Sequence, residues 1–79
     1  MMAGQSGSEP LYIGYPGGAV VESIEVGGEG SDVLADLDSD GHIVGIEILD
    51  VNVADDVALA RQFAEERGLA FPPNAVPAA

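Results

Sequence analysis

Cysteine and lysine are both absent from this chain of 79 residues. Without cysteine, no disulfide can stabilise the fold, and no thiolate can bind zinc or attack a substrate. No apolar run approaches the roughly 18 residues of a membrane-spanning helix, and the opening stretch MMAGQSGSEP lacks the basic and apolar regions of a signal peptide. We therefore expect a cytoplasmic protein without a bound cofactor.

Positive charge is also scarce, because two arginines stand against 14 aspartates and glutamates and the net charge is −12. Such a chain repels the phosphates of nucleic acids and the anionic surface of a membrane, so we expect neither as a partner. A basic protein partner would instead be attracted. Solubility and a high-salt habitat are alternative explanations of the same acidity, and the composition leaves all three open.

The length allows one small domain with a single thin core. Residues 1–9 are small and polar, which predicts a disordered N-terminal segment. Residues 10–70 form the predicted domain. Residues 71–79, FPPNAVPAA, are predicted to be an extended, mobile tail, because their prolines forbid further helix.

One stretch, DLDSDGHIVGIE, fits the calcium loop of an EF-hand at every prescribed position. Its candidate ligands are Asp36, Asp38, Asp40 and Glu47. An EF-hand needs a helix on each side of its loop, whereas apolar and polar residues alternate with period two on both sides of this one. We therefore predict a β-hairpin turning at Asp40-Gly41, and these carboxylates are weak metal candidates only.

The alternation also predicts the register of the hairpin. Three apolar pairs form its buried face: Val33 with Ile48, Ala35 with Ile46, and Leu37 with Val44. Asp36, Asp38 and Glu47 then fall on the opposite face, where we expect a charged surface exposed to solvent. A register shifted by one residue would bury Glu47, which makes the alternative unfavourable.

The remaining segments complete the predicted fold. Two strands are predicted over residues 11–15 and 19–26, with a turn at Pro16-Gly17 between them. After the hairpin the period becomes helical, with an apolar stripe of Val57, Leu59, Ala60, Phe63 and Ala64. Gly68 suits the left-handed residue that ends a helix. The predicted fold class is α+β: a four-stranded antiparallel β-meander followed by one C-terminal α-helix packed on one sheet face.

The stretch DVLADLDSDGHIVGIEILD resembles the signature of the YuzE-like family of small bacterial proteins, and LYIGYPGG resembles the earlier strand of that family. The resemblance covers about residues 11–50 and implies the β-meander-plus-helix fold. The family is a domain of unknown function, so the resemblance transfers no activity and no catalytic residues. A link of its members to toxin–antitoxin gene pairs implies an antitoxin-like or adaptor role.

Three functions stay open at this point. The first is a non-catalytic interaction module with a basic protein partner. The second is weak divalent-cation binding by the acidic turn. The third is a small enzyme, in which Asp36, Asp38 and Glu47 would be paired carboxylates and His42 a base. We rank the enzyme last, because His42 has no evident nucleophile or orienting partner and reads as a solvated turn residue.

Self-association is a further expectation. On the predicted pairing, three apolar side chains point away from the helix and remain exposed to solvent in a monomer: Leu34, Ile43 and Leu49. Two such faces could pair about a two-fold axis. Because each protomer carries a charge of −12, the predicted homodimer should become more stable as ionic strength rises.

Overall fold

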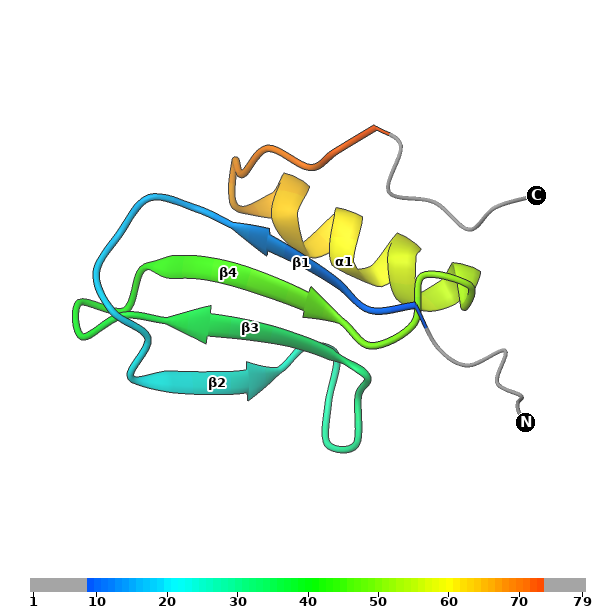
Figure 1. The fold of residues 1–79 in the computed structure, drawn as a ribbon, viewed down its shortest axis with the longest axis horizontal. Coiled ribbons are helices and arrows are strands. Elements are labelled where there is room, and N and C mark those ends of the chain that lie inside the picture. Colours follow the sequence, from blue (N-terminus) through cyan, green and yellow to red (C-terminus); the bar gives the residue numbers. More distant parts are fainter. Residues whose placement is uncertain (1–8, 74–79) are drawn as a thin grey trace.

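The computed structural model of this chain describes residues 9–73 and places four strands before one helix (Figure 1). The elements are β1 (Leu11–Gly14), β2 (Glu22–Glu25), β3 (Val33–Leu37), β4 (Ile43–Ile48) and α1 (Ala54–Glu66). The strands form one antiparallel sheet, and α1 packs against β3 and β4. The predicted α+β class is confirmed. We call the sheet face that bears α1 the inner face and the opposite one the outer face.

The strand order is β1-β4-β3-β2. The predicted meander is present in β2, β3 and β4, whereas β1 pairs with β4 and not with β2. Residues 15–21, which include the predicted Pro16-Gly17 turn, therefore cross the end of the sheet to reach its other edge (Figure 1). This order puts the apolar β4 in the interior of the sheet. It leaves β2, whose four residues are all exposed and two of them glutamate, at an edge where charge deters pairing with other sheets.

The hairpin of β3 and β4 has the predicted register over most of its length. Val33 faces Ile48, and Ala35 faces Ile46. The third predicted pair is wrong, because Leu37 faces Ile43 and a β-bulge leaves Val44 as an extra residue. An extra residue reverses the alternation of side chains beyond it. Ile43 therefore packs against the inner core instead of pointing outward, and Val44 is buried outside that core.

The core lies between α1 and the inner face of the sheet. The helix contributes Val57, Ala60, Phe63 and Ala64, which are the buried part of the predicted stripe, while Leu59 is half-buried. The sheet contributes Val33, Ala35, Ile46 and Ile48, none of which has measurable exposure. The helix ends as predicted: Gly68 adopts a φ of 70°, and the amide of Leu69 donates to the carbonyl of Ala64 at 2.9 Å.

Both ends of the described chain contact the domain. The amide of Glu9 donates to Asp50 Oδ1 at 3.2 Å, and the half-buried Phe71 packs against the core with Arg61 over its ring at 5.2 Å. Disorder is predicted for residues 1–9 and a mobile tail for residues 71–79, and most of both segments, residues 1–8 and 74–79, lies outside the described residues, so the predicted boundaries stay predictions. Within residues 9–73, no helix is long and apolar enough to cross a membrane.

Candidate functional site

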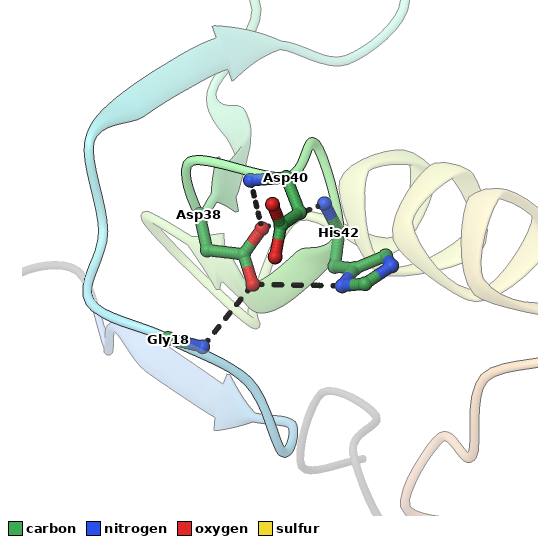
Figure 2. A network of polar contacts seen from close by, with 4 residues as sticks. All are labelled: Gly18, Asp38, Asp40 and His42. Atoms are coloured by element: carbon green, nitrogen blue, oxygen red, sulfur yellow. Dashed lines mark hydrogen bonds and ion pairs between the residues drawn. The ribbon is translucent and has the colours of Figure 1, made fainter.

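Asp38, at the end of β3, organises the acidic turn that the sequence singled out (Figure 2). Its side chain is 5% exposed, so the structure corrects our expectation that it belongs to the solvent-facing surface. The amides of Asp40 and His42 each donate to Asp38 Oδ1 at 2.9 Å. The turn therefore closes around this carboxylate, because an aspartate can satisfy the backbone groups that a short turn leaves unpaired.

The same carboxylate also holds the connection between β1 and β2. The amide of Gly18 donates to Asp38 Oδ2 at 3.1 Å across 20 positions of sequence (Figure 2). Beside it, a side chain at Gly17 would overlap Cγ1 of Val44, so the connection approaches the bulge more closely than any residue with a Cβ allows. Asp38 and the buried Val44 thus fix the path that brings β2 to the far edge of the sheet.

Hydrogen bonding sets the ionisation of Asp38. The amide of Gly18, followed by that of His42, holds the pKa of this carboxyl below its ordinary value, and burial opposes them less strongly. Asp38 is therefore a stable anion at neutral pH. Since its oxygens already accept three amides, we assign it a structural role.

Asp38, Asp40 and His42 are the one group in the described residues whose potential metal ligands gather together, within 4.8 Å. His42 Nδ1 lies 3.6 Å from Asp38 Oδ2, while Asp40 and the His42 ring are open to solvent. Of the four carboxylates in the calcium pattern, only Asp38 and Asp40 belong to this group. Asp36 and Glu47 lie farther along the hairpin, within β3 and β4, so strands and not helices flank the turn.

Asp36 and Glu47 lie on the outer face, and both are close enough to Tyr12 to influence its ionisation. Tyr12 pairs with Glu47 across β1 and β4, and a side chain at Gly45 would overlap its hydroxyl. Desolvation raises the pKa of Tyr12, and the charges of Asp36 and Glu47 raise it further. Asp36 Oδ1 accepts a hydrogen bond from Ser23 Oγ at 2.6 Å. The outer face is therefore a polar surface around a tyrosine that is 53% exposed.

A groove runs along the inner face where α1 leaves the sheet uncovered. Two hollows of about 830 Å³ and 360 Å³ share Ile24, Phe63 and Arg67 and together form this groove between α1 and β2. Its apolar lining is Ile24, Leu37, Ile43, Leu59, Phe63 and Leu69. We call this surface the β2 groove. Its two hollows are large enough to receive side chains of a ligand or partner.

Polar and charged residues line both hollows of the β2 groove. His42 and Arg67 line the larger hollow, and Glu25 and Glu66 line the smaller one together with Arg67. The guanidinium of Arg67 lies 3.8 Å from the centroid of the Phe63 ring and 3.8 Å from Glu66 Oε1. Arg67 is therefore already engaged by its own helix, and only part of its charge is available to a ligand.

The sequence reasoning missed the β2 groove and the burial of Asp38. The groove depends on which strand α1 leaves uncovered, and strand order has no local signal in the sequence. Asp38 had a partial signal, because Asp-x-Asp-Gly turns use side-chain acceptors, but its partner Gly18 lies in a distant segment. The involvement of His42 was also missed, since its backbone amide and not its ring makes the hydrogen bond.

Comparison with known proteins gives one positive finding. The model of a family described as "Protein of unknown function (DUF2283)" matches residues 9–52, which include all four strands and end just before α1. No curated protein and no solved structure matches this chain. The match extends over more than half of the chain and contains the resemblance noted above, so this protein belongs to that YuzE-like family of unknown function.

Proposed function

We propose that this protein is a non-catalytic interaction module that binds a basic protein, as an antitoxin or an adaptor does. The observation that carries the proposal is the β2 groove, an apolar surface left open in a protein of net charge −12. Exposed apolar surface of this kind usually marks a contact site. Negative charge would select a basic partner from among proteins that could fill it.

The distribution of the acidic residues supports this role. Asp38 and Asp50 accept backbone amides and serve the fold. Most of the other carboxylates lie on the surface, Glu66 at the groove among them. Surface charge of one sign accelerates encounter with an oppositely charged partner, while apolar contacts supply most of the affinity.

The turn supports a non-catalytic reading. Its one histidine, His42, lies beside Asp38, which superficially resembles a base with its orienting carboxylate. In nucleophilic catalysis such a pair also needs a nucleophile within reach of the imidazole. In residues 9–73 no hydroxyl side chain is hydrogen-bonded to the His42 ring, and Asp38 is occupied by backbone amides.

The proposal can be tested by quantitative co-purification from the cells that encode the protein. We expect basic proteins to be enriched and to dissociate as salt rises. The variant Glu66→Gln, which removes a charge at the β2 groove, should reduce their recovery. The matched control Glu65→Gln removes an exposed charge that does not line the groove and should not. Equal recovery with both variants, or enrichment of acidic proteins, would contradict the proposal.

A second candidate is weak divalent-cation binding at the turn, favoured by the gathering of Asp38, Asp40 and His42 within 4.8 Å. An imidazole beside two carboxylates suits transition metals better than calcium. Calorimetric titration with zinc, manganese and calcium tests it, with Asp40→Asn/His42→Asn as the variant that keeps Asp38. We expect dissociation constants on the order of millimolar for calcium, the weak end of its range in proteins. Micromolar calcium binding at fixed stoichiometry would contradict the hairpin account of this motif.

A further inference from the structure

One helix is too narrow to cover the whole inner face of the sheet. Neighbouring strands lie about 4.8 Å apart, so the outer strands of a four-stranded sheet are about 14 Å apart, whereas one helix is about 10 Å across. Here α1 packs on β3 and β4 and leaves the inner face of β2 open (Figure 1). Ile24, the inward residue in the middle of β2, remains 37% exposed although it pairs with the buried Ala35.

The walls of the groove suit the apolar face of such a helix. Phe63 and Leu59 form one wall from α1, spaced four residues apart on the same helical face. Ile24 forms the other wall, with Leu37 on the floor. A helix that presents side chains at i, i+3, i+4 and i+7 fills an elongated apolar groove of this kind.

The charges argue that the occupant is not a second copy of this chain. Two copies would each bring a charge of −12 to the contact, and α1 itself begins with Asp55 and Asp56 and ends with Glu65 and Glu66. A basic helix would instead be attracted by these negative charges. Its cationic side chains would meet a protein whose exposed carboxylates, Glu66 at the groove among them, far outnumber its two arginines.

We propose that the β2 groove binds one amphipathic helix with a basic polar face, contributed by the partner protein, which packs beside α1 and completes the inner layer. This inference rests on the proposed function, since it names the segment by which the basic partner is recognised. The docked helix buries Ile24 and the half-buried Leu59 against its apolar stripe, and its lysines or arginines face the acidic surface around the groove.

The test uses the full chain and three designed peptides of about four helical turns. The first has a leucine stripe with lysine on the polar face. The second has the same composition in an order that breaks the stripe, and the third has glutamate in place of lysine. We expect the first to bind at least about tenfold more tightly than the others, the loss expected for one interface anchor. Amide chemical-shift changes should concentrate on β2 and the β2-facing side of α1.

A pair of protein variants locates the contact. Ile24→Lys places a positive charge inside the groove, and Val21→Lys makes the same change at an apolar residue that is 64% exposed and does not line the groove. We expect the first variant to bind the leucine–lysine peptide about tenfold more weakly and the second to bind it nearly as the wild type does. Thermal unfolding checks that both fold, and the peptide comparison on the wild-type protein needs neither variant.

The outcomes separate this inference from the proposed function. Equal binding of the two lysine peptides, or shifts confined to the outer face, would overturn the helix-in-groove inference and leave a basic partner supported. Equal binding of the glutamate peptide would overturn the basic character of the helix. Absence of binding by any lysine peptide would overturn both. A stable dimer of the protein alone that buries β2 and α1 would show that the occupant is a second copy.

Discussion

The backbone amide of Gly18 donates a hydrogen bond to the carboxylate of Asp38, 3.1 Å away and 20 residues later in the chain. This contact joins the connection that leaves β1 to the turn that joins β3 and β4. A motif that has the sequence of a calcium loop therefore holds two distant parts of the backbone together by a hydrogen bond.

Asp38→Asn should destabilise the fold. An asparagine side chain has one acceptor oxygen, so it cannot serve the amides of both Gly18 and Asp40 as the two carboxylate oxygens do. We expect a lower melting temperature, measured by circular dichroism at pH 7. Asp40→Asn, at an exposed neighbouring position, is the control and should melt close to the wild type. Equal melting temperatures for all three proteins would show that Asp38 does not stabilise the fold.

The contribution of Asp38 should depend on pH in a defined direction. Its pKa is lower in the folded chain than its ordinary value of 3.8, chiefly because of the amides of Gly18 and His42. The stabilisation is therefore fully present above the unfolded pKa and is lost as the pH falls through the folded pKa. The difference in unfolding free energy between wild type and Asp38→Asn should be constant near neutrality and shrink below about pH 4. A difference that grew on acidification would contradict this assignment.

Gly17 and Gly18 should respond differently to the same substitution. A Cβ at position 17 would overlap the buried Val44, whereas a Cβ at position 18 would meet Asp38 at an ordinary contact distance of 3.5 Å. We expect Gly17→Ala to destabilise by about 1–3 kcal/mol and Gly18→Ala by less than about 1 kcal/mol. Chemical denaturation measures both. The double variant Gly17→Ala/Val44→Ala should recover part of the loss, and strict additivity would indicate that the two residues do not touch.

Ile46 tests the assignment of the inner face. It has no measurable exposure and faces Ala35 beneath α1. Ile46→Ala should cost about 3 kcal/mol, and Ile46→Asp should cost roughly 3 kcal/mol or more because it buries an unpaired charge. Leu49→Ala is the control at a residue that is 41% exposed, with an expected change within about 0.5 kcal/mol. If Ile46→Asp kept full thermal stability, the assignment of Ile46 to the buried inner face would be wrong.

The homodimer stays a prediction, but fewer apolar side chains on the outer face now support it. Ile43 was one of three apolar side chains expected on the outer face, and the bulge places it against the inner core instead. Leu34, which is half-buried, and Leu49 remain. Sedimentation at low and high salt distinguishes the cases, and a dimer through the outer face should strengthen with salt because it brings two acidic protomers together.

Much of this fold was predictable because its local patterns are strong. The alternation around Asp40-Gly41 identified the hairpin, and the helical spacing from Val57 to Ala64 identified α1. The position of β1 was not predictable, because Leu11 and Ile13 alternate in the same way whichever strand they pair with. The bulge at Val44 was not predictable for a similar reason, because an extra residue in a strand has no signature in the residue types.

The candidate site was predictable only in part. The Asp-rich turn was located correctly, but the pattern did not reveal that Asp38 is buried and that Asp36 and Glu47 lie elsewhere on the hairpin. Burial of Asp38 depends on a connection that is remote in sequence. The β2 groove needed both the strand order and the placement of α1, and neither follows from local periodicity.

The pairing of β1 with β4 has a consequence for how the chain acquires its structure. Leu11 pairs with Ile48, so β1 cannot find its neighbour until most of the chain has been synthesised, whereas the two hairpins of β2, β3 and β4 close over short loops. We expect the amides of β3 and β4 that face each other to gain protection in pulsed hydrogen exchange before those of β1. Early protection of β1 would show the reverse order. Until β1 docks, one side of β4 presents a free edge, so a newly made chain exposes its most apolar strand during that interval.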